Sequence, residues 1–158
     1  MAQFLGTHQG RLDAKSRVSI PAPFRASLKA ESHSPNPAAG APLVLRRSHQ
    51  EKCIEVWPEK AFEALSAPLA KLARFSPERN NLALALFADA HQLETDKEGR
   101  IVLPANLITY AGLTDRGIQF LGVGDIFQIW DATLAERRLE QARVSALEQG
   151  YTLPGLPS

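Results

Sequence analysis

The chain of 158 residues contains little cysteine or histidine: there is one cysteine, Cys53, and the four histidines are scattered. A single cysteine forms no disulfide within a chain, and these residues do not have the spacing of a zinc site. We therefore expect a protein of the reducing cytoplasm that holds no metal ion.

A long hydrophobic run is also missing. The longest apolar stretch, Leu82–Ala88, is far shorter than the roughly 20 residues that a membrane-spanning helix needs. No signal peptide precedes Phe4. These absences predict a soluble protein with no membrane partner.

Motifs of catalysis are absent as well. The sequence has no glycine-rich phosphate loop, no constellation of serine, histidine and acid, and no recognisable cluster of metal ligands. We therefore expect no enzyme, no cofactor and no small-molecule substrate.

Net charge is close to zero, because 18 Lys and Arg residues balance 17 Asp and Glu residues to give +1. This balance argues against a protein that coats nucleic acid by bulk attraction. Only a local basic patch remains as a device for binding DNA.

What the sequence does contain is an internal repeat. The stretch Asp13–Ala22 returns as Asp96–Ala105, with an Arg four residues after each Asp and Pro-Ala after each apolar triplet. His8-Gln9 also aligns with His91-Gln92 in the same ungapped window. So many matches indicate a duplication, which dictates the fold class.

The repeated stretch has the chemistry of a turn, a short strand and a helix. The Asp side chain can bond backbone amides two residues on, and Ser16 or Gly99 supplies a small residue before the chain extends. The apolar triplet is a strand too short to stand alone, and the Pro after it suits the first turn of a helix. We expect short helices over about 22–30 and 105–111, with Gly112 ending the second.

The doubled Asp-x-x-x-Arg motif resembles the MraZ family of bacterial transcriptional regulators. Phe4-Leu5-Gly6 before the first motif and Ile129-Trp130-Asp131 late in the second half add to the resemblance. It implies an α+β fold of two pseudo-symmetric, AbrB-like swapped-hairpin β half-domains, each with a short and a longer helix. Many relatives carry Gly where this chain has Ser16, and a positive φ there would strain the Ser mildly.

The resemblance also implies a function and an assembly. Members form ring-shaped homo-oligomers that bind double-stranded DNA at promoter repeats of the division and cell-wall gene cluster, so we expect a cytoplasmic, nucleoid-associated regulator. The duplication predicts three segments, which are a first half over 1–75, a second half with the linker helix over 76–150, and a flexible tail over 151–158.

Charge distinguishes the two copies of the motif. Residues 8–17 carry a net +2, whereas residues 91–100 carry a net −1. Because Arg suits bidentate contact with guanine or phosphate, we predict a DNA-binding site dominated by the first copy. Its residues are Arg17, Lys15 and Arg11, with Asp13 orienting Arg17, while Arg100, Lys97 and Asp96 have a weaker or structural role.

Two alternatives stay open. Each Asp and Arg pair, four residues apart around a turn, is equally explained as an ion pair that only holds the loop. At the level of function, the alternative is an antitoxin-like interaction or scaffolding module of AbrB fold, with DNA binding secondary.

The remaining patterns place the other elements. We expect an exposed loop over 31–42, a helical region over 58–74 that Pro68 kinks or divides, and a linker helix whose run Leu82–Ala88 is buried between the halves. Strands are expected over 43–45, 53–57, 118–123 and 126–130, and a helix capped by Asp131 should run to about Gln149.

Three further sets of residues have candidate roles. Arg46-Arg47 is a second basic spot, either a contact to a nucleic-acid backbone or a solvated charge pair. Trp57 and Trp130 are expected as core anchors at strand ends, and the histidines of the repeat as locally packed strand residues.

Overall fold

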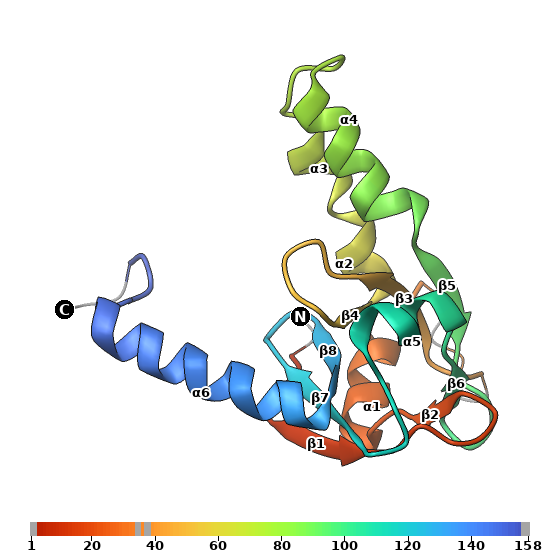
Figure 1. Ribbon diagram of the computed structural model, residues 1–158. Coiled ribbons are helices and arrows are strands. Elements are labelled where there is room, and N and C mark those ends of the chain that lie inside the picture. The colour runs from red at the N-terminus through yellow and green to blue at the C-terminus, as the bar shows by residue number, and fades with distance from the viewer. Residues whose placement is uncertain (1–2, 34–35, 37–38, 156–158) are drawn as a thin grey trace.

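The structure is a computed structural model that describes residues 3–33, 36 and 39–155. It is a mixed α+β protein built on one six-stranded antiparallel sheet, as expected (Figure 1). In spatial order the strands are β1 (Thr7–Gly10), β7 (Ile118–Gly122), β8 (Phe127–Asp131), β4 (Ile54–Trp57), β3 (Pro42–Arg47) and β5 (His91–Glu94).

A separate two-stranded ribbon and several helices complete the described part of the chain. The ribbon pairs β2 (Arg17–Ser19) with β6 (Arg100–Val102). The helices are α1 (Ala22–Ala30), α2 (Glu59–Glu63), α3 (Ser66–Leu69), α4 (Pro77–Ala83), the π-helical turn η1 (Leu84–Ala88), α5 (Ala105–Ala111) and α6 (Ala132–Gln149).

Both copies of the repeat contribute strands to the sheet. Strand β1 pairs with β7, and β5, its counterpart in the repeat, pairs with β3. In the centre β4 pairs with β8, so that Glu55 lies opposite Gln128. Trp57 Nε1 donates to Glu55 Oε1 at 3.0 Å, and Trp130 Nε1 donates to Gln128 Oε1 at 2.9 Å. The two tryptophans, which end corresponding strands of the repeat, therefore make corresponding hydrogen bonds.

The core lies between the sheet and the short helices. Phe24 of α1 packs against Phe4 and Phe127, with ring centroids 5.3 and 4.6 Å apart. Trp130 is buried, as expected of a core anchor, whereas Trp57 is only half-buried and contacts Phe62. Apolar burial of this kind is the main stabilising term of the fold.

The helix ends follow the local chemistry of the sequence. Helices α1 and α5 begin directly after Pro21 and Pro104, and Gly112 ends α5 with a φ of +67°. The Asp131 side chain accepts a hydrogen bond from the Leu134 amide at 3.1 Å, and Gly150 ends α6. These predicted boundaries are confirmed.

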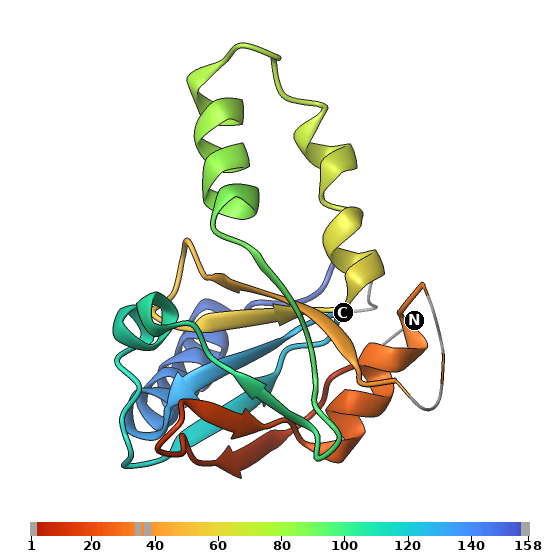
Figure 2. The same ribbon diagram turned by 90° about the vertical axis from the view of Figure 1, so that its right-hand side faces the viewer.

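The expected burial of the linker helix is wrong. Helix α4 and η1 turn back against α2 and α3 to form a hairpin, residues 59–88, that projects from the sheet (Figures 1 and 2). None of the residues of α4 or η1 is buried. A helix in a two-layer hairpin can bury only the stripe that faces its partner, which here includes Phe87 against Phe62 at 5.4 Å.

The region 58–74 is divided, as expected, but not at Pro68. The break falls at Ala64 and Leu65, and Pro68 lies within α3. The expected loop 31–42 has no helix or strand in its described part before β3 begins at Pro42, and residues 34–35 and 37–38 lie outside the described residues. The tail has no helix or strand over 151–155, and 156–158 lie outside the described residues.

The basic spot at Arg46-Arg47 is not a nucleic-acid contact at Arg46. The Arg46 side chain is 2% exposed and pairs with Glu55 at 2.9 Å under the hairpin. Arg47 pairs with Asp89 at 2.7 Å and lies over the ring of Tyr110. The hairpin that covers β3 comes from about 40 residues further along the chain, so local sequence gave no sign of it.

No helix in the described part of the chain combines the length and apolarity needed to cross a membrane. Cys53 is a free, buried cysteine, and burial raises the pKa of its thiol well above the ordinary value. Its thiol is therefore a protonated core group rather than a nucleophile.

We expect that residues 1–75 alone will not fold as a stable monomer. Strand β1 would lose its partner β7, and β4 would lose β8, leaving open sheet edges. Size-exclusion chromatography with light scattering should show aggregates or dimers for this fragment, with the full chain as control. A monomeric fragment with a cooperative melt would contradict the expectation.

Candidate nucleic-acid interface

The β2–β6 ribbon presents its two motif arginines on one outward face. Val18 and Ile101, paired at the middle of the ribbon, are buried in the core. Because side chains alternate along a strand, Arg17 and Arg100 point to the opposite face. Arg17 lies opposite Val102 in the register, and Arg100 lies opposite Ser19. The two arginines are thus related by the antiparallel pairing and lie two residue steps apart.

The Asp13 loop holds Arg17 from both the backbone and the side chain. Asp13 Oδ1 accepts hydrogen bonds from the amides of Lys15 and Arg17, at 2.9 and 2.8 Å. Asp13 Oδ2 accepts from Arg17 Nε at 2.8 Å. The carboxylate is therefore bonded to the inner nitrogen of the guanidinium, which fixes the direction of the Arg17 side chain.

The Asp96 loop repeats this arrangement almost atom for atom. Asp96 Oδ1 accepts from the amides of Glu98 and Arg100, both at 2.9 Å, and Oδ2 accepts from Arg100 Nε at 3.0 Å. One difference is electrostatic, because Arg100 Nη2 also pairs with the carboxylate of Glu98. Arg100 therefore has two acidic partners where Arg17 has one.

These hydrogen bonds lower the pKa of both aspartates below the ordinary value. The largest cause is the backbone amide of the motif Arg, at position 17 for Asp13 and at position 100 for Asp96. A hydrogen bond to the charged form favours ionisation. Both carboxylates are consequently ionised at neutral pH and able to orient their arginines.

The two loops differ at one backbone position. Ser16 has a φ of +61°, so the strain expected for a Ser in this position is present. The equivalent Gly99 has a φ of +79°, and a Cβ there would lie 2.5 Å from Arg25 Nη1. Arg25 of α1 also donates to the carbonyl of Ile20. The positive φ favours glycine in the second loop, and the Arg25 guanidinium packs over the space that a side chain would take.

The other predicted cations lie on the surface around the ribbon. Lys15 and Arg11 are exposed on the first loop and its approach, and Lys97 is exposed on the second. The sequence reading missed Arg25, which belongs to the first half but contacts the loop of the second. No spacing along the chain signals such a contact, because it depends on the pairing of the halves.

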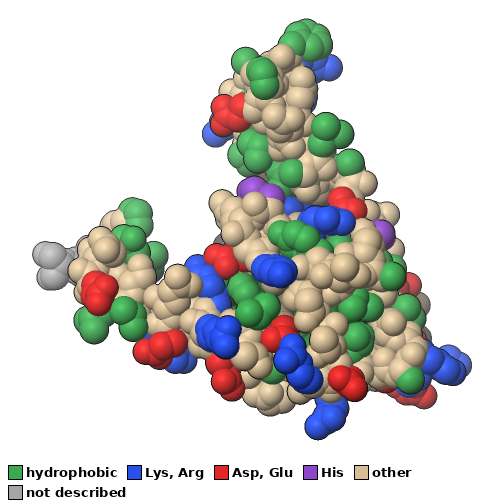
Figure 3. Space-filling view, viewed as in Figure 1, with side chains coloured by type: hydrophobic (Ala, Val, Ile, Leu, Met, Phe, Trp, Pro, Cys, Tyr) green, Lys and Arg blue, Asp and Glu red, His purple; other side chains and the backbone are tan. Residues whose placement is uncertain are grey.

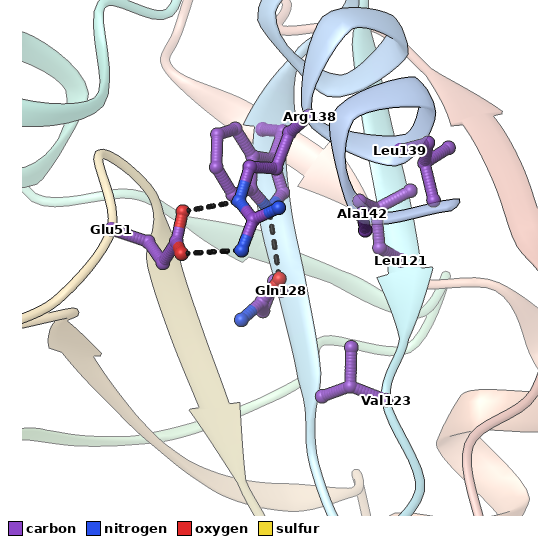
Figure 4. A pocket seen from close by; sticks show the side chains of 8 residues that line it. Glu51, Leu121, Val123, Gln128, Arg138, Leu139 and Ala142 are labelled. Carbon is purple, nitrogen blue, oxygen red and sulfur yellow. Dashed lines mark hydrogen bonds and ion pairs between the residues drawn. The ribbon is translucent and has the colours of Figure 1, made fainter. Parts of the chain in front are cut away.

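An apolar cavity of about 190 Å³ lies elsewhere, between α6 and the sheet (Figure 4). Its polar lining is internally satisfied: Arg138 donates to both oxygens of Glu51, at 2.8 and 2.9 Å, and Gln128 accepts from Trp130. The described residues contain no group of three or more His, Cys, Asp or Glu that could hold a metal ion. The cavity offers contact surface and no free reactive group.

The fold and the site together define a class: an α+β protein with an antiparallel sheet, in which two copies of an Asp-x-x-x-Arg loop flank a shared two-stranded ribbon. A family model described as "MraZ protein, putative antitoxin-like" matches residues 3–84 and 86–150. The chain belongs to the MraZ family.

Relatives agree over nearly the whole chain. A protein of Gluconacetobacter diazotrophicus is 55% identical over 156 residues, covering 98% of this chain and 95% of that relative. One of Gluconobacter oxydans is 49% identical, covering 92% of this chain and 86% of the relative, and one of Rhodospirillum rubrum is 34% identical, covering 92% and 91%. All three are named "Transcriptional regulator MraZ".

We expect Asp13→Asn to destabilise the protein at neutral pH and much less in acid. Because the pKa of Asp13 is lowered on folding, its stabilising effect is complete above the unfolded value of about 3.9 and is lost as the pH falls through the lowered value. Urea unfolding at pH 7 and pH 3 should show a larger gap between wild type and variant at pH 7.

The matched control is Asp115→Asn, which changes an exposed carboxylate outside both loops. It should leave the stability nearly unchanged at pH 7. An equal gap between wild type and Asp13→Asn at the two pH values would contradict the role given to the carboxylate.

Proposed function

We propose that this protein is a sequence-specific DNA-binding transcriptional regulator. The observation that carries the proposal is the placement of Arg17 and Arg100 on one outward face of a two-stranded ribbon. A two-stranded ribbon fits the major groove of B-DNA, and Arg reads guanine through two parallel hydrogen bonds. The relatives named as transcriptional regulators support the same function.

The outward face of the ribbon also carries an exposed apolar side chain. Val102, which lies opposite Arg17 in the ribbon, is 58% exposed. An apolar side chain gains no stabilising contact from water, so this exposed position is free to contact a partner. Apolar contact with the methyl group of thymine is one way in which proteins read a base. An Arg and a Val on adjacent strands therefore provide two kinds of base contact.

The first copy of the motif is proposed to make the specific contacts. Arg17 has a single carboxylate partner and lies near the exposed cations Lys15 and Arg11, whereas Arg100 is paired with two carboxylates. Because two carboxylates neutralise the charge of Arg100, this residue is proposed to stabilise the fold or to contribute only weakly to DNA binding. Asp13 then acts as the positioning group for Arg17.

The architecture is proposed to be a pair of AbrB-like swapped-hairpin halves, residues 1–75 and 76–150. The exchange of β1 and β5 between the halves supports this reading. So does the sheet order β1-β7-β8-β4-β3-β5: when each strand is replaced by its counterpart in the other half, the same order is obtained, read from the opposite edge.

Assembly into a ring-shaped homo-oligomer is part of the proposal. A nearly neutral subunit is a weak ligand for DNA, so useful affinity at promoter repeats requires several subunits at once. Large apolar side chains are exposed on both projections, with Phe75 at 86% on the hairpin and Leu147 at 84% on α6 (Figure 3).

The repeat indicates where a neighbour fits. Helix α6 follows β8 as α2 follows β4, but α2 is covered by η1, whereas the cavity beside α6 is open. A helix of a second copy could pack on α6 as η1 packs on α2, and it would then bury the apolar surface beside α6. We propose that the assembled regulator acts in the cytoplasm, on the nucleoid, at the promoter of the division and cell-wall gene cluster.

The same exposed apolar surface favours one second candidate, an antitoxin-like interaction or scaffolding module. In that function α6 and the hairpin bind another protein and DNA binding is secondary. The two candidates differ in the effect of the loop arginines, which matter for DNA and not for such a partner.

Arg17→Ala is expected to lower the affinity for promoter DNA by roughly 1–3 kcal/mol and to relax sequence preference, since it removes a base contact. Lys15→Ala should weaken binding to all sequences alike and reduce the slope of log K against log salt by about one, as loss of a phosphate contact does. Fluorescence anisotropy with promoter and scrambled duplexes over a salt series measures both.

Arg100→Ala is the matched control for Arg17→Ala. It should alter stability or oligomer size and affect DNA only indirectly. If Arg100→Ala abolishes binding in an intact oligomer while Arg17→Ala binds normally, the assignment is reversed.

Leu147→Glu is expected to reduce the size of the oligomer without lowering the melting temperature, because the side chain is exposed within one subunit. Gln149→Glu, two residues further along α6, adds the same charge without removing an apolar group. Multi-angle light scattering compares the two. A wild-type monomer at micromolar concentration that binds one isolated repeat tightly would contradict the multivalent model.

A further inference from the structure

We infer that the cleft between α1 and the loop before β6 binds a phosphate group of the DNA backbone. The cleft has a volume of about 460 Å³, and its lining includes Arg25, Lys29, Gly40, Thr95, Asp96 and Lys97. This inference rests on the proposed function and adds residues outside the repeated motif to the DNA contact. Figure 2 shows α1 close to the loop that leads into β6.

The cleft is positive although the sequence around the second loop is acidic. Arg25 and Lys29 come from the first half and join Lys97 on its wall. Among the described residues that line the cleft, the one carboxylate is that of Asp96, which accepts hydrogen bonds from two backbone amides and from Arg100. Arg25 and Lys29 thus bring two cations to a loop whose own sequence window, residues 91–100, sums to net −1.

The walls of the cleft are held by close backbone contacts. A Cβ on Gly40 would lie 1.9 Å from the carbonyl oxygen of Thr95. Thr95 Oγ1 accepts from the Ala41 amide at 2.8 Å, and the Thr95 amide donates to Ala41 O at 3.0 Å. Little conformational entropy is lost when such a prepared site binds a ligand.

The repeat shows that these cations do not belong to the common scaffold. When Pro21 is laid on Pro104, Arg25 falls on Ile108 and Lys29 falls on Gly112. Helix α5 therefore brings no charge to the first loop, whereas α1 brings two to the second. The first loop carries its own positive charge, and the second receives it from the other half.

A phosphodiester of duplex DNA is the ligand that fits this position. The cleft adjoins the loop of Arg100, whose side chain lies on the outward face of the ribbon, so a duplex on that face passes next to it. Lys and Arg bind the backbone phosphates of DNA and set its register without reading sequence. The first loop would specify bases while the cleft fixes the backbone.

The test uses the full chain with Lys29→Gln and with Lys29→Gln combined with Lys97→Gln. Matched controls are Lys71→Gln and its combination with Lys60→Gln, exposed lysines of the hairpin. Anisotropy is measured with promoter and scrambled duplexes over a salt series. Each lysine lost from the cleft should flatten the salt slope by about 0.9 and weaken both duplexes equally, and the controls should keep the wild-type slope.

Arg25→Gln is tested separately, because its guanidinium also bonds Ile20 O and packs over Gly99. It should lower the slope like the lysines, and its thermal melt shows whether the loop has been disturbed. The lysine variants keep the inference testable if Arg25→Gln fails to fold.

The outcomes separate this inference from the proposed function. If the cleft variants keep the wild-type salt slope and the wild type prefers the promoter duplex, only the assignment of the cleft as a phosphate site is wrong. If the cleft variants have flattened slopes but the wild type shows no preference for the promoter duplex, sequence-specific regulation is wrong and the assignment of the cleft stands. Absence of DNA binding by the wild type overturns both.

A free anion is the other source of the same chemistry. Calorimetric titration with inorganic phosphate, without DNA, distinguishes it. If the lysine variants lose binding of inorganic phosphate while their DNA salt slopes stay unchanged, the cleft is a free-phosphate site and its assignment to DNA is wrong.

Discussion

The antiparallel pairing of β2 with β6 is the constraint on which the rest of the structure depends. Each strand has three residues, too few to be stable alone, and each comes from a different half of the chain. Their pairing buries Val18 and Ile101 together and places Arg17 and Arg100 on one face. The amide of Leu103 donates to Ser16 O, and that of Ile20 donates to Gly99 O, so each loop is fastened to the opposite strand. The site exists only when both halves are folded.

Local features of the fold could be predicted from the sequence because local chemistry determines them. Pro21 and Pro104 start their helices, Gly112 ends α5, and the Asp13 carboxylate caps its own loop, all through atoms within a few residues of one another. The pairing of Asp13 with Arg17 was predictable for the same reason.

Features that depend on distant residues could not be predicted. The hairpin that covers Arg46 and the approach of Arg25 to Gly99 join segments about 40 and 74 residues apart. Hydrophobicity alone made Leu82–Ala88 look like a buried helix, but its burial is decided by which neighbour faces it. A charge window along the chain over residues 91–100 omits Arg25 and Lys29 of α1, because these cations come from the other half of the chain.

The duplication explains how one chain can hold two similar loops with different surroundings. A symmetric frame fixes geometry, because the hydrogen bonds of Asp13 and Asp96 are nearly identical. Substitutions outside the motif then change the electrostatics of each copy separately, as Arg25 opposite Ile108 and Glu98 opposite Lys15 do. A homodimer of a single half would carry every such change twice. Fusion of the halves lets one loop keep Arg17 with a single carboxylate partner while the other adjoins a cleft lined by α1, so the two ends of the ribbon present different surfaces.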